Sequence, residues 1–158
     1  MEKKIFIACP ISKYLHKNGM DPNFEKFIIS VYDICNQYSS NVFMALHREK
    51  FGKARMEDDV CTPLDYMEMK QSDIVIAIPE DSQGVAVELG WASAMNKKIL
   101  VILNDNFCHS PLINAIHTVT EAKYYKISGI DGYHIEELMN SISNYLDINI
   151  QRRVVKTK

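Results

Sequence analysis

The sequence has little of what marks several common classes of protein. Its 158 residues contain one tryptophan, six glycines and five prolines, and no repeat, low-complexity tract or Pro/Gly-rich linker divides them. Four cysteines are scattered along the chain without the spacing of a zinc pair or a CxxC redox motif: Cys9, Cys35, Cys61 and Cys108. We therefore expect one domain over residues 1–158, with reduced thiols that pack as small apolar side chains.

Long apolar runs and a large excess of one charge are also missing. The segment "MEKKIFIACPIS" has an apolar run of about five residues, which is too short for a signal peptide or a membrane span. The formal net charge is −2, which argues against a nucleic-acid partner. The basic end, 150–158, is expected to be a flexible tail. These features predict a soluble cytoplasmic protein with no nucleic-acid or membrane partner.

Familiar catalytic motifs are absent as well. The chain has no GK[ST] phosphate loop, no GxGxxG dinucleotide fingerprint, no HExxH and no candidate serine triad. We therefore predict no metal and no cofactor.

What the sequence does contain is an alternation of short apolar runs and longer amphipathic segments. Strands are expected at 4–9, 41–46, 73–78, 97–103 and 122–127, and helices at 23–38, 62–71, 84–95, 111–119 and 133–146. This order predicts a doubly wound α/β domain with a five-stranded parallel sheet and helices on both faces. Ligands of such folds lie at the carboxyl ends of the strands, so the segments of interest are 10–22, 47–61, 79–84 and 104–110.

The segment "GVAVELGWASAM" (84–95) carries a single charge, at Glu88. An acid near a helix N-terminus can simply be favoured by the helix dipole. However, a helix that is apolar all round is usually buried, and a carboxylate there must be paired, raised in pKa or directed into a cleft. Glu88 is therefore a candidate catalytic residue.

The preceding residues, "EDSQG", join a predicted strand to this helix. Free N–H groups at a helix N-terminus bind anions, Ser82 adds a hydroxyl, and Gly84 allows close approach to the backbone. This pattern is compatible with a phosphate or ribose site. The alternative is that Asp81 or Ser82 only caps the helix.

Other polar residues fall on the same predicted edge of the sheet. In "TPLDYMEMKQ" (62–71), Thr62 is expected to cap the helix, and Asp65 is then either a capping acid or a second carboxylate of the crevice. His47 follows the second strand directly, and it is either structural or a ligand contact. Two carboxylates beside an anion site suit chemistry at a sugar carbon.

The segment "DIVIAIPEDSQGVAVELGWASAMNKKILVIL" resembles the signature of the nucleoside 2-deoxyribosyltransferase superfamily. In that pattern an apolar strand and a short loop precede G-x-x-x-E-[LI]-G-x-A, and a strand follows a basic turn. The resemblance extends from "KIFIACPIS" to about position 119. Within the superfamily, "HREKFG", "CTPLDYMEM" and "ELGWASA" most resemble the nucleotide N-glycosidase branch, whose members include hydrolases of CMP or hydroxymethyl-CMP. The mammalian deoxynucleoside 5′-monophosphate N-hydrolase is more distantly similar.

The resemblance implies roles for individual residues. Glu88 matches the nucleophile that attacks C1′, and Asp65 matches the acid that holds the sugar hydroxyls and the catalytic Glu. Ser82 and Gly84 match phosphate-binding positions, and Ser110 matches a phosphate-binding serine that reaches a neighbouring subunit's site. A homodimer or higher oligomer with shared sites is thereby implied. The resemblance implies base or sugar contacts for Phe6, Pro10 and Ser12. It implies base or phosphate contacts for His47 and Arg48.

Two departures from the family pattern bear on the substrate and the acceptor. Ser12 stands where several monophosphate hydrolases carry a basic residue. The C-terminal "DINIQRRVVKTK" does not resemble the segment with which deoxyribosyltransferases complete a partner's site, which favours water as the acceptor.

Three functions are therefore considered. The leading one is a nucleoside 5′-monophosphate N-glycosidase that releases a free base, a pyrimidine by resemblance. The second is a nucleoside 2-deoxyribosyltransferase that exchanges bases between deoxynucleosides. The third is a nucleotide-sensing module without catalysis.

Overall fold

A five-stranded parallel sheet forms the centre of the computed structural model, which describes residues 2–130 and 133–150. The strand order is β4-β1-β5-β6-β7, and every neighbouring pair is parallel. The strands are β1 (Ile5–Ala8), β4 (Val42–Met44), β5 (Ile74–Ala77), β6 (Lys98–Asn104) and β7 (Ala122–Ile127). The first crossover runs to one edge and the later ones to the other, which creates the switch point typical of doubly wound folds between β1 and β5.

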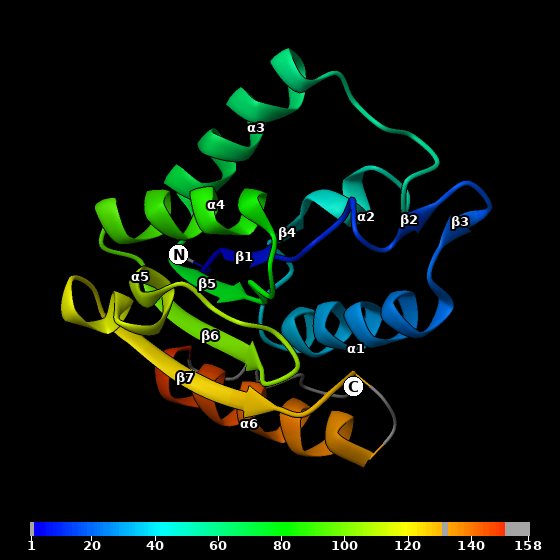
Figure 1. The fold of residues 1–158 in the computed structure, drawn as a ribbon. Coiled ribbons are helices and arrows are strands. Elements are labelled where there is room, and N and C mark those ends of the chain that lie inside the picture. Colours follow the sequence, from blue (N-terminus) through cyan, green and yellow to red (C-terminus); the bar gives the residue numbers. More distant parts are fainter. Residues whose placement is uncertain (1, 131–132, 151–158) are drawn as a thin grey trace, which may run out of the picture.

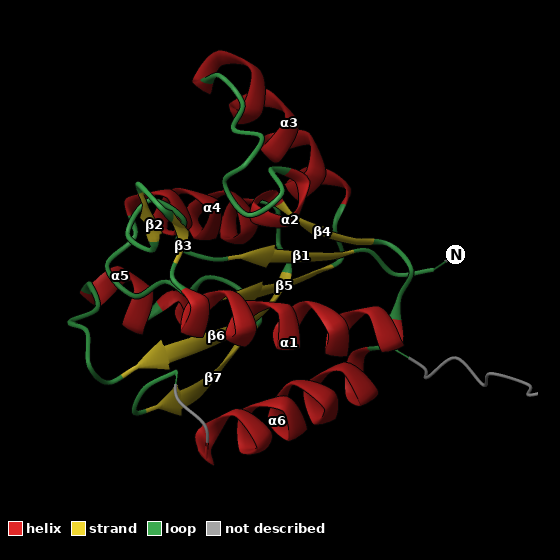
Figure 2. Ribbon diagram, turned by 90° about the vertical axis from the view of Figure 1, so that its right-hand side faces the viewer, coloured by secondary structure: helices red, strands yellow, loops and turns green. Residues whose placement is uncertain are grey.

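Helices cover both faces of this sheet (Figures 1 and 2). On one face lie α1 (Pro22–Tyr38) and α6 (Tyr133–Asn149), and on the other lie α3 (Asp58–Gln71) and α4 (Gln83–Ala94). Three shorter elements are α2 (Ala45–Arg48), α5 (Pro111–Asn114) and the 3₁₀ turn η1 (Ile116–Thr118). The predicted fold class is confirmed.

The alternation of side chains along each strand explains how one sheet packs against helices on both faces. Successive side chains of a strand point to opposite faces. In β1, Ile5 and Ile7 join the apolar cluster under α1 and α6, whereas Phe6 and Ala8 join the cluster under α4. Strands buried on both faces need apolar residues at every position, and all four β1 residues are 0–1% exposed.

The helix α1 illustrates how local sequence sets an element's limits. Asp21 accepts a hydrogen bond from the Phe24 backbone N–H at 2.9 Å, and Pro22 occupies the first helical turn, where its missing N–H costs nothing. The helix then buries one apolar face, which includes Phe24, Phe27, Ile28 and Val31.

Several predicted limits are wrong. The segment 10–22, expected to be a loop, contains a small antiparallel hairpin of β2 (Leu15–His16) and β3 (Gly19–Met20). The second strand stops at Met44, and α2 follows it at once. Strand β6 runs one residue further than expected, to Asn104.

The largest error concerns the helix predicted over 62–71. This helix begins at Asp58, with Glu57 in the capping position, so Thr62 does not cap it and Pro63 lies inside it. Asp58 and Asp59 occupy the first turn, where carboxylates are favoured by the dipole, and Pro63 removes only one backbone hydrogen bond. Thr62 and Pro63 resemble a helix start chemically, but the acidic first turn lies earlier.

The basic tail predicted over 150–158 lies outside the described residues except for Ile150. Among the helices of residues 2–130 and 133–150, none has the length and apolar character needed to cross a membrane.

Candidate active site

A cavity of about 610 Å³ opens at the carboxyl ends of β1 and β5. Its walls come from the segment after β1 (Cys9–Lys13), the N-terminal part of α4 with the residues before it, α3, and the connection between α2 and α3. This is the position expected for a ligand site in a doubly wound sheet. Its volume falls in the usual range for small-molecule sites, about 300–1,000 Å³.

Five acidic residues line this cavity: Glu49, Asp58, Asp65, Asp81 and Glu88. Two of them are the carboxylates expected from the sequence, Glu88 on α4 and Asp65 on α3. The pKa of Glu88 is raised from 4.5 to about 8, mainly by burial and also by the charge of Asp65, while Arg48 acts in the opposite direction. Burial likewise raises the pKa of Asp65, against the lowering effect of its contact with Arg48. A carboxylate in a partly dry cavity stabilises positive charge better than a hydrated one.

The surroundings of Glu88 differ from the expectation in one respect. The helix α4 is not buried on all sides, because Val85, Leu89 and Ala92 form its buried face while Val87 is 52% exposed. Glu88 lies between these faces and lines the cavity. The expectation that α4 is buried on all sides is therefore wrong, although Glu88 does line a cavity.

Asp65 is not a capping acid, because α3 begins at Asp58, well before it. Its Oδ1 accepts a hydrogen bond from the Nη1 of Arg48. The same guanidinium donates from Nη2 to Glu49 Oε1 at 3.1 Å. Asp65 is thus held by a fixed cation while it lines the cavity with Glu88.

Arg48 does not line the cavity itself. It stands behind Asp65, at the last position of α2, with its guanidinium 5.4 Å from the centroid of the Phe43 ring. Its Nε is buried and has no hydrogen-bond partner. The arrangement places Arg48 where it orients Asp65 and lowers the pKa of Glu88.

The predicted anion site lies at the start of α4. Ser82 is the N-cap, and its Oγ accepts a hydrogen bond from the Val85 N–H at 3.3 Å, so the capping interpretation is confirmed. Ser82, Gln83 and Gly84 also line the cavity. Ser82 therefore caps α4 and lines the cavity wall at the same time.

The other predicted contact residues divide into two groups. Pro10 and Ser12 line the cavity with the carboxylates. Phe6 does not line the cavity, because it is fully buried in the apolar cluster between the sheet and α4, with its ring centroid 5.0 Å from that of Phe43. His47 does not line it either, since it stacks on Tyr32 with centroids 4.4 Å apart.

Ser110 lies away from this cavity in the same chain. It caps α5 by accepting a hydrogen bond from the Leu112 N–H at 3.2 Å. His117 packs against Tyr124, whose hydroxyl lies 3.1 Å from the His117 Nδ1. Neither residue joins the two carboxylates within one chain.

Sequence reasoning missed two basic side chains of the cavity, Lys13 and Arg55. Lys13 lies five residues after the end of β1, and Arg55 lies in the charged connection after α2. The backbone of that connection turns sharply, with left-handed φ angles at Lys50 (50°), Phe51 (54°) and Gly52 (86°). The position of Lys13 after a buried strand was the available signal, because the carboxyl end of that strand faces the ligand.

No group of three or more His, Cys, Asp or Glu side chains within residues 2–130 and 133–150 is arranged to hold a metal ion. The described cavity combines five carboxyl side chains, two basic side chains and a helix N-terminus.

Comparison with solved structures identifies proteins that this chain resembles in fold and sequence. The CMP N-glycosidase BcmB of Clostridium botulinum is 27% identical over 90% of this chain and 99% of its own, with a TM-score of 0.64. BlsM is 25% identical over 99% and 98% of the two chains, with a TM-score of 0.71. A conserved protein of Enterococcus faecalis V583, 15% identical with a TM-score of 0.56 over 95% of this chain and 100% of its own, shares the fold. No curated protein matches the chain.

These findings define an enzyme class, that of N-glycosidases and glycosyltransferases acting on nucleosides or nucleotides. The model of the family "Nucleoside 2-deoxyribosyltransferase" matches residues 19–142. The chain belongs to this family, and the resemblance drawn from the sequence is confirmed.

Proposed function

We propose that this enzyme is a nucleoside 5′-monophosphate N-glycosidase that releases a free pyrimidine base and a (deoxy)ribose 5-phosphate. The observation that carries the proposal is the shared cavity, whose wall includes Glu88, Asp65 and residues 82–84 at the start of α4. In this proposal the sugar binds beside the two carboxylates, with its phosphate at the N–H groups that begin α4 and its anomeric carbon at Glu88. The activity of BcmB on CMP favours a pyrimidine monophosphate.

The reaction has two steps. The ionised Glu88 attacks C1′, a C–O ester bond forms, and the bond from C1′ to the base nitrogen breaks with its electron pair leaving on the base, which takes up a proton. Water then attacks the ester, returns Glu88 to its carboxylate form and gives the sugar phosphate. Asp65, fixed by Arg48, orients the sugar hydroxyls and helps stabilise the developing positive charge of the sugar ring.

A panel of ribo- and deoxynucleoside monophosphates, with the matching nucleosides, tests the reaction by chromatography of the free base. We expect base release from CMP or dCMP, and a loss on the order of a thousandfold in Glu88→Gln. Glu121→Gln serves as the matched control, because Glu121 is an exposed carboxylate whose contact is a 3.7 Å ion pair with Lys98. If no monophosphate of the full panel yields base, the proposal is wrong.

Base exchange between deoxynucleosides is the second candidate, because the family model is that of a deoxyribosyltransferase. In that reaction a second base replaces water at the glycosyl ester. Deoxyadenosine formed from deoxycytidine and adenine would favour the transferase. Free base formed from monophosphates without an added base favours the hydrolase.

We further propose a homodimer that pairs through α3 and α4. These helices lie side by side, with Tyr66 and Trp91 in an edge-to-face contact at 5.3 Å. Their outer surface exposes large apolar side chains, at 44–52% of their area: Val60, Leu64, Met67 and Val87. A patch of this kind on two adjacent helices suits association with a second copy.

A further inference from the structure

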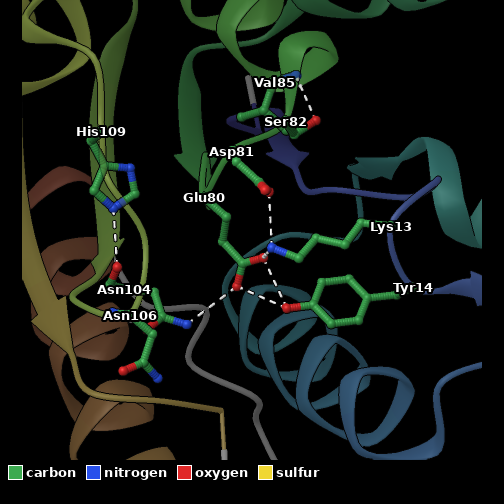
Figure 3. A network of polar contacts seen from close by, with 9 residues as sticks. All are labelled: Lys13, Tyr14, Glu80, Asp81, Ser82, Val85, Asn104, Asn106 and His109. Atoms are coloured by element: carbon green, nitrogen blue, oxygen red, sulfur yellow. Dashed lines mark hydrogen bonds and ion pairs between the residues drawn. The ribbon is translucent and has the colours of Figure 1, made fainter.

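Two connecting segments and the end of strand β6 meet at one buried carboxylate, that of Glu80 (Figure 3). Glu80 follows β5, and its side chain is 0% exposed. It accepts hydrogen bonds from the Tyr14 hydroxyl at 2.8 and 3.0 Å and from Asn104 Nδ2 at 3.3 Å. Its φ of 43° is left-handed, a strained conformation for a glutamate. A buried carboxylate needs such partners, and they connect the segments after β1 and β5 with the end of β6.

The fourth group of this network is the ammonium of Lys13. Its Nζ lies 3.2 Å from Glu80 Oε2 and 2.8 Å from Asp81 Oδ1. The same Nζ is 3.2 Å from the centroid of the Phe107 ring. Lys13 therefore stands between a fully buried carboxylate and an exposed one, since the Asp81 side chain is 61% exposed.

These two contacts of Lys13 differ in strength for a physical reason. The pair with the exposed Asp81 contributes little, because water competes for both groups. The Glu80 carboxylate is 0% exposed although the Lys13 side chain is 29% exposed, and breaking their pair would remove the cation from a buried carboxylate, which is more costly. If an anion approaches, Lys13 can give up Asp81 at little cost while it stays bound to Glu80.

The position of this pair matters because Lys13, Asp81, Ser82 and Gly84 line the same cavity. A phosphate at the N-terminus of α4 would lie beside the Asp81 carboxylate, and like charges repel. The ammonium has three donor hydrogens, so it can bind Glu80 and a phosphate oxygen at the same time.

We propose that Asp81 competes with the substrate's phosphate for Lys13, so that binding exchanges the Lys13–Asp81 pair for a Lys13–phosphate pair while Glu80 keeps Lys13 in place. This inference rests on the proposed function, since it assigns the phosphate to the start of α4. Asp81 is then a residue that sets affinity: it holds the cation in the free enzyme and weakens phosphate binding. Glu80 is a positioning residue, which acts through Lys13.

The test measures binding of inorganic phosphate and ribose 5-phosphate by calorimetry at low salt. In Asp81→Asn we expect the Kd of both anions to fall about threefold, because the competing carboxylate is gone. In Lys13→Gln we expect it to rise at least about tenfold, because a charge-assisted hydrogen bond is lost. Lys3→Gln is the matched control, because the Lys3–Asp73 ion pair has the same 2.8 Å distance as the Lys13–Asp81 pair. In this variant the Kd of both anions should not change.

An unchanged or higher Kd in Asp81→Asn overturns the exchange. Because Asp81 is exposed, this variant should fold even if Lys13→Gln does not, and it decides the question alone. In a wild-type enzyme that hydrolyses monophosphates, that result refutes the exchange and leaves the proposed function standing. A protein that shows the expected Kd changes but releases no base refutes the proposed function and keeps the exchange.

Discussion

The raised pKa of Glu88 makes the activity strongly dependent on pH. The proposed nucleophile must be ionised, but burial and the neighbouring Asp65 charge raise its pKa from 4.5 to about 8. With that value about one molecule in a hundred carries the ionised form at pH 6, about one in ten at pH 7 and half at pH 8. We therefore expect kcat/KM to rise about tenfold per pH unit from pH 6 and to level off above about pH 8.

The same shift affects stability in a defined direction. Because the folded-state pKa is raised, the protonated Glu88 stabilises the fold fully below about pH 4.5, and this contribution is lost as the pH rises through about 8. Each factor of ten in the ionisation constant corresponds to about 1.36 kcal/mol, so ionising Glu88 costs the folded state roughly 3–5 kcal/mol. Partial access to the cavity favours the lower end of this range.

Two assays measure these effects. Initial rates of base release between pH 6 and 9 give the profile of kcat/KM, and urea unfolding of wild type and Glu88→Gln gives the difference in stability. The wild type should lose stability relative to the variant as the pH rises from 5 to 9. The second assay needs no substrate, whose phosphate titrates near pH 6. A flat rate profile, together with a stability difference that does not change with pH, would refute the reasoning.

Three further predictions follow from single contacts. Arg48→Gln should move the inflection of the kcat/KM profile above pH 8, because Arg48 lowers the pKa of Glu88; initial rates measure this. The same variant should lower the free energy of unfolding by about 2–4 kcal/mol in urea, because Asp65 and Glu49 lose their ion pair. Gly52→Ala should cost about 1–3 kcal/mol in a thermal melt, since φ is 86° there and the added Cβ would lie 2.4 Å from Leu15 Cδ1; an unchanged melting temperature contradicts this. Val87→Glu should convert the proposed dimer to a monomer in light scattering without a loss of stability, because Val87 is 52% exposed in the single chain.

The layers of the fold could be predicted from the sequence because they depend on repeated local patterns. Continuous apolar runs such as Ile74–Ala77 favour strands covered on both sides, and this run, inside the strand expected over 73–78, is the fully buried β5. The hairpin β2–β3 has two residues in each strand, too few for any period to show. The start of α3 was misplaced because two acidic residues begin the helix before the residues that resemble a cap.

The site was predictable as far as topology alone positions residues. Glu88, Asp65 and Ser82 come together because their segments flank the carboxyl end of β5. The partner of Asp65 was not predictable, because Arg48 follows the edge strand β4 and its direction depends on how α2 turns. Phe6 could have been excluded, since it stands in the middle of a strand with no polar face.

The connection between α2 and α3 places Arg55 and Met56 on one wall of the cavity, and Arg55 is exposed. The proposed nucleophile Glu88 and its neighbour Asp65 stand instead on α4 and α3. Under the proposed function, substitutions at positions 55 and 56 would reshape the space beside the substrate without touching either carboxylate or the apolar core. We therefore expect base preference to change, in evolution or in the laboratory, through exchanges at these two positions that cost the fold little.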